Sequence, residues 1–333
     1  MLRTMHEGSV QTTMTGFEIV LISLATRGFS LKLIKTIHVS ERPYYLAFAK
    51  TGCKLAVGFG DCVEFYDAST WRRVGPRFKK IGSPICTFGT GEGFIFCNDF
   101  RVESYTIGKR ATQRLLNILP SDIIGLVSPI TIDGIAACED RSVLAVTLAK
   151  CIILYDLGHS RRIKTFALGE DFGGETISTR HGFVEGYGRA RIFSFSGVGE
   201  PFMLPGQADT SLNFAYDRFH DILYSGGTSG DLYSWDLRRK RLIYHAYPMD
   251  HGVSAIAFTG KHSLIAMGSR ADPKLDDSST ANALVIVDGR TARVLCRAKF
   301  KTDGVMALAF SSSGEELVEA DRNGTLNFFR LIH

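Results

Sequence analysis

The sequence lacks the features that mark membrane-spanning and secreted proteins. In its 333 residues, the longest apolar run near the N-terminus, residues 19–25, is far shorter than the about 20 residues of a membrane-spanning helix. No charged stretch followed by an apolar core, as in a signal peptide, precedes that run. The seven cysteines are odd in number and form no Cys-x-x-Cys pair, which favours buried thiols over a disulfide framework. We therefore expect a reducing compartment, the cytoplasm or the nucleus.

Motifs for catalysis or cofactor binding are also missing. Residues 89–93 are glycine-rich, but a predicted strand follows them and no Gly-Lys-Ser/Thr closes them, so a tight turn is favoured over a phosphate-binding loop. The nine histidines lack metal-binding spacing, and His251 and His262 are expected to be solvated loop residues. The adjacent carboxylates at 139–140 and 276–277 are expected to be solvated loop charge. We expect no catalytic residue, no cofactor and no metal.

An internal repeat is the most informative feature that the sequence does contain. Four 13-residue stretches share one pattern: 46–58, 214–226, 256–268 and 308–320. Each has alanine second, an aromatic residue third, an aliphatic residue tenth and a very small residue last. The apolar ends are too short for helices and the middle is small and polar, so each stretch predicts a β-hairpin. Such self-similarity predicts one small unit stacked many times.

A third strand is predicted after each hairpin, and its spacing gives the period of the repeat. These third strands end at Asp67, Thr106, Asp156, Ser196, Asp236, Asp288 and Arg330. The intervals are 39, 50, 40, 40, 52 and 42 residues, and four of the six match the about 40 to 45 residues of a four-stranded propeller blade. Loop insertions account for the two long intervals: residues 107–127, with a helix-like piece over 111–119, and the Pro/Asp/Ser-rich residues 270–282.

The chain resembles the seven-bladed WD-repeat β-propellers. Residues 234–236, Ser-Trp-Asp, form the one literal Trp-Asp ending, and the third strands that end at Asp67, Asp156 and Asp288 are relaxed versions. The family's aspartate six residues before the tryptophan is replaced by Ser229 in blade five and Asn323 in blade seven, and no Gly-His pair precedes a first strand at the family's distance. The resemblance implies a ring whose blades depend on apolar packing more than on the family's polar network.

The expected fold class is all-β: a seven-bladed β-propeller of four-stranded antiparallel blades. A single domain is expected over residues 17–333, after a flexible N-terminal tail at residues 1–16. Blade seven reaches the last residue after only three strands, so residues 30–37 are expected to supply its outer strand and close the ring. Another strand is expected at residues 17–24, at the start of the same closure.

Positive charge gathers just after the third strands. Twenty of the 39 lysines and arginines lie there, although the net charge is only +5. Because the strands of a blade alternate in direction, all third-to-fourth turns leave one face of the disc, towards its rim. The sequence therefore predicts a basic arc, with these candidate contact residues for an acidic partner or RNA: Arg72, Arg73, Lys79, Lys80, Arg161, Arg162, Lys164, Arg238, Arg239, Lys240 and Arg241.

A basic arc suits an acidic protein surface or an RNA backbone, and ordinary solvated charge is the alternative. Phosphoinositide is not expected, because residues 237–240 match the family's Phe/Leu-Arg-Arg-Gly lipid motif for three residues and lack its glycine. Nucleic-acid binding also requires aromatic residues among the basic ones for base stacking, and only Trp71, Phe78 and Tyr244 stand near them in the sequence.

The sequence thus predicts a non-enzymatic interaction scaffold, one subunit of a larger protein assembly, which binds other proteins through its loop faces and the basic arc. The alternatives are an RNA-contacting subunit of a ribonucleoprotein complex and, third, a propeller hydrolase.

Overall fold

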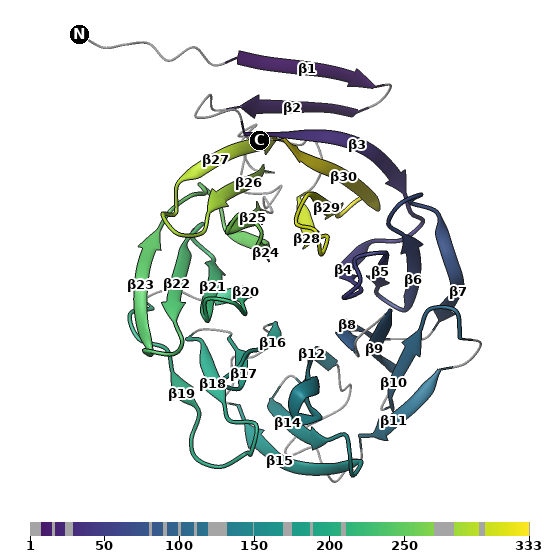
Figure 1. Cartoon of the computed structure of the whole chain (residues 1–333), viewed down its shortest axis with the longest axis vertical. Coiled ribbons are helices and arrows are strands. Elements are labelled where there is room, and N and C mark those ends of the chain that lie inside the picture. Colours follow the sequence, from purple (N-terminus) through teal and green to yellow (C-terminus); the bar gives the residue numbers. More distant parts are fainter. Residues whose placement is uncertain are drawn as a thin grey trace.

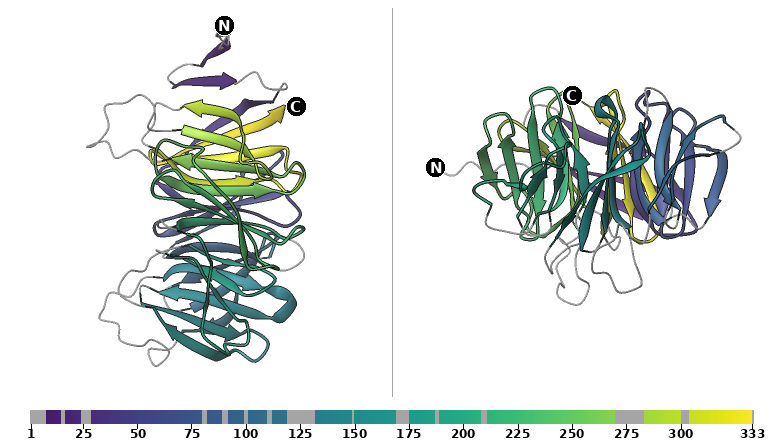
Figure 2. Two further views of the ribbon diagram at one scale, coloured as in Figure 1. Left: turned by 90° about the vertical axis from the view of Figure 1, so that its left-hand side faces the viewer. Right: turned by 90° about the horizontal axis from the view of Figure 1, so that it is seen from below.

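The chain folds into a disc-shaped ring of seven blades. A computed structural model describes residues 8–14, 17–23, 29–79, 82–88, 92–98, 101–109, 112–118, 132–148, 150–168, 175–186, 189–207, 211–269, 283–299 and 304–332. Within these ranges it has thirty strands and one short 3-10 helix, η2 (Glu139–Arg141). Seven antiparallel sheets stand around a central axis, with each first strand at the axis and each fourth strand at the rim (Figures 1 and 2). The predicted fold class is confirmed.

The first three blades follow one another directly along the chain. Blade one comprises β4 (Pro43–Phe48), β5 (Lys54–Phe59), β6 (Cys62–Asp67) and β7 (Arg73–Lys79). Blade two comprises β8 (Gly82–Phe88), β9 (Gly93–Asn98), β10 (Arg101–Thr106) and β11 (Gln113–Asn117). Blade three comprises β12 (Ile132–Cys138), β13 (Val143–Leu148), β14 (Cys151–Asp156) and β15 (Arg161–Ala167).

The next three blades repeat the same meander. Blade four has the shortest strands: β16 (Thr176–Ser178), β17 (Phe183–Glu185), β18 (Arg191–Phe193) and β19 (Phe202–Met203). Blade five comprises β20 (Ser211–Asp217), β21 (Ile222–Gly227), β22 (Leu232–Asp236) and β23 (Arg241–Ala246). Blade six comprises β24 (Val253–Thr259), β25 (Leu264–Ser269), β26 (Ala283–Asp288) and β27 (Val294–Lys299).

Blade seven closes the ring as the sequence predicted. Its first three strands are β28 (Val305–Phe310), β29 (Glu316–Asp321) and β30 (Thr325–Ile332). The fourth strand is β3 (Ser30–His38), which comes from the start of the chain and pairs antiparallel with β30 from Ser30↔Ile332 to His38↔Thr325. The two ends of the propeller are therefore joined by backbone hydrogen bonds, which remove an open edge.

The first residues of the chain differ from the prediction. The expected flexible tail at 1–16 contains a strand, β1 (Gly8–Met14), which forms a hairpin with β2 (Phe17–Ser23). The strand expected at 17–24 exists, but β2 pairs with β27 at the rim of blade six and does not take part in the closure of blade seven. Gly8–Met14 contains one valine and two threonines, which are β-branched residues enriched in strands, and this composition fits strand pairing.

The prediction of a helix-like piece within residues 107–127 is also wrong. The described part of this piece is β11, which pairs antiparallel with β10 and is the fourth strand of blade two. The leucines and arginine of this segment favour a helix by local propensity, but the open edge of β10 needs a partner, and tertiary pairing overrides weak propensity. The insertion at residues 270–282 lies outside the described residues, and so does Lys80.

The 13-residue repeat is the inner hairpin of blades one, five, six and seven. Its very small last residue has a packing reason. A Cβ atom on Gly226 would overlap the side chain of Val253, the first residue of the next inner strand, and a Cβ on Gly268 would overlap Val305 in the same way. Neighbouring inner strands approach so closely at these points that a side chain does not fit.

Apolar side chains fill the spaces between the blades. Among the described residues there are seven buried clusters, one between each pair of neighbouring blades around the ring. The largest fully buried side chain, Trp235, belongs to the cluster between blades four and five, and its Nε1 donates to the carbonyl of Pro205 at 2.8 Å. Apolar packing between blades therefore holds the ring, as the resemblance implied.

The aspartate at the end of a third strand stabilises the turn that follows it. One carboxylate oxygen accepts a backbone N–H from the following turn: Thr70 to Asp67 at 3.0 Å, His159 to Asp156 at 3.1 Å, Arg239 to Asp236 at 2.9 Å and Thr291 to Asp288 at 3.0 Å. Four residues after the aspartate, Trp71, Ser160, Lys240 and Ala292 have φ between 49° and 58°. The aspartates that resemble the Trp-Asp ending thus shape the third-to-fourth turn.

Candidate functional site

The residues of the predicted basic arc lie on the third-to-fourth turns and on the outer strands of three blades. Ten of the eleven are in the described part of the chain, and all ten side chains are exposed. Arg72, Arg238, Arg239 and Lys240 lie in turns, and the other six lie on β7, β15 and β23. The arc therefore begins on one face of the disc and continues down its rim, at blades one, three and five.

Several arc residues also support their own blade. Arg239 Nη1 lies 2.7 Å from Asp236 Oδ2, and Arg73 Nη1 lies 3.2 Å from Glu64 Oε1. The hydrogen bond from Arg239 holds the pKa of Asp236 below its usual range. The arginines of these pairs are largely exposed, and exposed ion pairs contribute about 0 to 1 kcal/mol. An incoming carboxylate can therefore compete for these guanidinium groups.

Two lysines of the arc lie over aromatic rings. Lys164 Nζ is 4.7 Å from the centre of the Phe166 ring, and Lys240 Nζ is 4.6 Å from that of Phe202. The second contact joins a turn of blade five to the outer strand of blade four. Both ammonium groups remain exposed, so these contacts position the charges without neutralising them.

The three aromatic residues that the sequence places near the arc, Trp71, Phe78 and Tyr244, are engaged in contacts within the ring. Trp71 is buried, and its ring lies 4.0 Å from that of Phe328 in blade seven. Phe78 packs against Phe65, Phe96 and Tyr105 between blades one and two. The Tyr244 hydroxyl donates to the Gly289 carbonyl at 2.9 Å. Because single-stranded nucleic acid is bound largely by stacking on exposed rings, these contacts favour a protein partner over RNA.

A cavity of about 290 Å³ lies at the axis, where the inner strands begin. Tyr44, Tyr45, Asp133, Glu175 and Asn213 supply its polar groups, and apolar residues of blades one, six and seven form the rest of its lining. Burial raises the pKa of Glu175 to about 7, opposed by the Phe214 N–H, which donates to Glu175 Oε2 at 2.9 Å. Burial, with smaller contributions from Glu175 and Asp133, raises the pKa of Tyr45 to about 12.

This axial cavity has fewer carboxylates and histidines among its described lining residues than a propeller hydrolase requires. We take three converging carboxylates or histidines as the minimum for such a site. Two carboxylic acids, Asp133 and Glu175, are the titratable acids among its described lining residues, and no histidine is among them. The Tyr45 hydroxyl donates to the Asp133 backbone carbonyl at 3.3 Å, and this hydrogen bond joins blades one and three.

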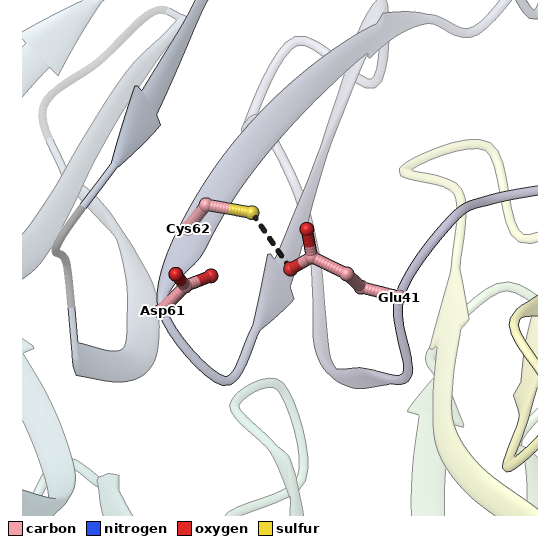
Figure 3. A group of neighbouring side chains, drawn as sticks. All are labelled: Glu41, Asp61 and Cys62. Atoms are coloured by element: carbon pink, nitrogen blue, oxygen red, sulfur yellow. Dashed lines mark hydrogen bonds between the residues drawn. The ribbon is translucent and has the colours of Figure 1, made fainter.

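One group of side chains has the composition of a metal site (Figure 3). Ligand atoms of Glu41, Asp61 and Cys62 lie within 4.8 Å of one another, and the Cys62 thiol donates to Glu41 Oε2 at 3.4 Å. Arg77 on β7 reaches the same group: its Nη2 lies 3.0 Å from Cys62 Sγ and also donates to Glu41 Oε1. A bound cation would therefore face a guanidinium group that contacts two of its three ligands.

The electrostatics of this group agree with a structural ion pair. Burial raises the pKa of the Cys62 thiol to about 11, although the hydrogen bond from Arg77 acts in the opposite direction. Metals bind the thiolate, so a thiol that stays protonated is a poor ligand. We therefore interpret Glu41, Cys62 and Arg77 as a contact that fixes β7 to the loop before β4. Arg77 follows the third strand of blade one, but its guanidinium group contacts Cys62 and Glu41, so it does not extend the arc.

Blade five has one polar contact that the sequence reasoning missed. Asp231 is buried, and its Oδ1 lies 2.7 Å from His245 Nε2 on β23. The His245 ring stacks on Tyr233, with centroids 4.1 Å apart. The family's aspartate position in blade five is Ser229, and Asp231 stands two residues later. The signal that would have found the pair is an aspartate directly before β22 and a histidine on β23, the strand that pairs with β22.

The comparisons add no functional assignment. Neither the scan against protein-family models nor the search of curated proteins finds a match to the chain. The class that the structure defines is thus the seven-bladed β-propeller.

Proposed function

We propose that this chain is a non-enzymatic interaction scaffold and a divergent relative of the WD-repeat propellers, which acts as one subunit of a larger protein assembly. Its rigid ring presents turns on two faces and basic residues along one rim, and partners bind across those surfaces. Other proteins, with acidic surfaces towards the arc, are the expected partners. The cytoplasm or the nucleus is the expected location.

The observation that carries this proposal is the exposure of the arc. All ten described candidate residues present their side chains to solvent, on one face and the adjoining rim of blades one, three and five. Clustered positive charge of this kind attracts acidic partners and speeds their association. A stiff ring also loses little conformational entropy on binding, because its turns are already fixed by the aspartate caps.

Two further observations agree with the proposal. No helix in the described ranges is long and apolar enough to cross a membrane. The six cysteine side chains that the structure describes are free thiols, and four of them are buried, which is compatible with a reducing compartment.

RNA binding is the second candidate function, because the same arc suits a phosphate backbone. The buried position of Trp71 and the packed positions of Phe78 and Tyr244 favour protein over RNA. A hydrolase is the third, and the two carboxylic acids of the axial cavity give it little support.

The test is recovery of partners with the tagged full chain at mild salt, with and without nuclease. Proteins that are recovered after nuclease treatment support the scaffold, and loss of all partners on nuclease treatment would overturn it in favour of an RNA-mediated complex. Recovery should also fall as salt is raised, because the arc acts through exposed charges.

A pair of matched variants tests the arc itself. Arg238→Glu/Arg241→Glu reverses two arc charges beside Asp236 and leaves Arg239, which supports the turn, in place. Lys32→Glu/Arg101→Glu makes the same change in net charge at exposed positions outside the arc. Loss of partners with the first variant alone is expected. Equal recovery with both would mean that the arc is ordinary solvated charge.

A further inference from the structure

A second hollow lies on the face that carries the third-to-fourth turns, closer to the axis than the arc. It has a volume of about 700 Å³, and its lining comes mainly from first-to-second turns of blades one, three, four and five. First-to-second and third-to-fourth turns share a face because adjacent strands are antiparallel. This cationic hollow is lined by Lys50, Ala137, Cys138, Asp140, Arg141, Ser178, Thr179, Arg180, Phe195, Tyr216 and Arg218.

Its charge is predominantly positive. Four lining residues are basic, Lys50, Arg141, Arg180 and Arg218, and one, Asp140, is acidic. Arg218 pairs with Asp140, but both side chains are well exposed, so the pair contributes little and can open. The guanidinium of Arg141 lies 5.1 Å from the centre of the buried Phe195 ring, which holds it at the wall of the hollow.

Two exposed apolar side chains stand on the same face. Phe219 is 82% exposed and Val198 is 76% exposed, the highest values among the large hydrophobic residues of the described chain. Phe219 follows Arg218 in the β20–β21 turn, and Val198 lies between β18 and β19, three residues after Phe195. Apolar surface that remains in water on a rigid turn marks an interaction site when other observations agree.

The turn that presents Phe219 is fixed by hydrogen bonds. Asp217 Oδ1 accepts the N–H groups of Phe219 at 2.9 Å and His220 at 3.1 Å, and Asp217 Oδ2 lies 2.6 Å from His220 Nδ1. The Phe219 ring meets the His220 ring edge to face, with centroids 4.8 Å apart. The backbone of the turn is therefore fixed where it carries Phe219, so little backbone entropy is lost when a partner covers this side chain.

Blades four and five are also tied together beside the hollow. The Tyr216 hydroxyl donates to Asp221 Oδ1 at 2.6 Å and accepts the N–H of Arg180 at 3.2 Å. Asp221 Oδ2 lies 2.6 Å from His181 Nε2. Arg180 and Phe219 thus sit on two turns whose relative position is set by side-chain contacts.

We infer that the cationic hollow binds an acidic segment of a partner protein that carries a hydrophobic side chain next to its carboxylates. Arg141, Arg180 and Arg218 hold the carboxylates, and the hydrophobic side chain packs against Phe219. The inference rests on the proposed function and names the chemistry of its partner. Val198 is aliphatic and is no platform for a nucleobase, whereas the exposed Phe219 ring can pack against either kind of ligand. The apolar preference of the site therefore rests on Val198, and an oligonucleotide probe is included in the test.

The test is fluorescence anisotropy with the full chain and labelled synthetic probes. The principal probe is a ten-residue peptide of aspartate and glutamate with a central Phe-Leu pair. One matched peptide has Ser-Ser at the centre, another has asparagine and glutamine in place of the acids, and a uridine oligonucleotide represents RNA. We expect the acidic Phe-Leu peptide to bind at least about tenfold more tightly than either matched peptide.

Variants at exposed positions locate the site without disturbing the fold. Arg141→Glu/Arg180→Glu should weaken binding of the acidic Phe-Leu peptide at least tenfold, and Phe219→Ser should weaken it several-fold while leaving the Ser-Ser peptide unchanged. Lys32→Glu/Arg101→Glu and Ile34→Ser, at exposed positions on other surfaces, should leave binding as it is. Circular dichroism confirms that each variant is folded.

Each other outcome overturns the inference. No binding of the acidic peptides, or tighter binding of the oligonucleotide than of the peptides, removes the peptide site. Binding that survives Arg141→Glu/Arg180→Glu but is lost with Arg238→Glu/Arg241→Glu places the peptide on the arc, so that the inference fails and the proposed scaffold stands. Loss of all cellular partners on nuclease treatment, in contrast, is failure of the proposed function.

Discussion

Glu319 gives the sharpest test of the packing between strands in this ring. It lies on β29 with no exposed surface, and its Oε2 accepts the Asn327 Nδ2–H at 2.8 Å. Its Oε1 has no partner among the described residues. The Thr36 hydroxyl donates to Asn327 Oδ1 at 2.9 Å, so the contact extends across β30 to the closing strand β3. Burial raises the pKa of Glu319 to about 8, with a further contribution from Asp321.

The pH dependence follows from this pKa. In the unfolded chain, glutamate titrates near ~4.3. Between that pH and about 8, the folded protein keeps a proton that the unfolded chain has lost. The free energy of unfolding therefore falls as pH rises, by about 1.4 kcal/mol per pH unit within that window. From pH 5 to pH 8 the loss due to this one group is roughly 3 kcal/mol, a large share of the ~5 to 15 kcal/mol that stabilises a typical domain.

Glu319→Gln removes this titration and keeps the shape of the neutral side chain. We expect the variant and the parent to have nearly equal stability at pH 5, and the variant to become roughly 3 kcal/mol more stable than the parent by pH 8. Urea unfolding followed by fluorescence at pH 5, 6, 7 and 8 measures the difference. The control is Glu316→Gln on the same strand, where the carboxylate pairs with Arg330 at 2.9 Å and is partly exposed.

Parallel pH profiles for Glu319→Gln and the parent would refute the reasoning, because they would mean that Glu319 is ionised inside the folded ring. A variant that is less stable than the parent at pH 8 would refute it as well. A widening gap for Glu316→Gln in the same pH range would show that the effect does not come from burial.

Three further predictions concern the turns, the inner strands and the thiols. Asp67→Asn should lower the free energy of unfolding by about 1 kcal/mol at pH 7, because hydrogen bonds from Lys54, Ser69 and Thr70 hold the pKa of Asp67 well below its usual range. The difference between variant and parent should shrink as pH falls below about 4. A difference in thermal melts that stays constant with pH would contradict this. Gly268→Ala should cost about 1 to 3 kcal/mol by overlap with Val305, and adding Val305→Ala should restore part of it in a double-mutant cycle; strictly additive losses would exclude the overlap. Cys53 is exposed and Cys62 is buried, so Cys53→Ser should remove the fast phase of thiol modification in the native protein and Cys62→Ser should not; the reverse result would contradict the burial pattern.

The architecture could be predicted from the sequence because its signals are local and repeated. The aspartate endings, the very small last residue of the hairpin and the period near 40 residues each arise from contacts within one blade or with the next blade. The closing strand β3 could be predicted because blade seven has only three strands at the end of the sequence and needs a fourth. The β11 segment could not be predicted in the same way, because its leucines favour a helix and only the open edge of β10 makes it a strand.

The cationic hollow could not be predicted, because no local pattern announces it. Its basic residues come singly from the turns of four blades, from Lys50 in blade one to Arg218 in blade five. In the sequence, each is one basic residue in a polar turn, the most ordinary position for a charge. Phe219 carried a better signal, since an aromatic residue between a basic residue and a histidine in a predicted turn has no apolar neighbour along the chain.

The chemistry of the turns explains why charge alone does not establish binding on this face. At Asp236 the carboxylate is used within the turn, where it accepts the N–H and the guanidinium of Arg239, while Arg238 and Arg241 point to solvent. Asp67 and Asp156 likewise accept backbone N–H groups of their own turns, so these carboxylates are used within the blades, whether or not a partner exists. Phe219 is different, because its exposed side chain contributes little to the stability of the unbound propeller. Apolar surface left in water forgoes about 25 cal/mol of burial free energy per Å². The inferred binding face therefore rests on the apolar side chains beside the cationic hollow, and not on the basic residues alone.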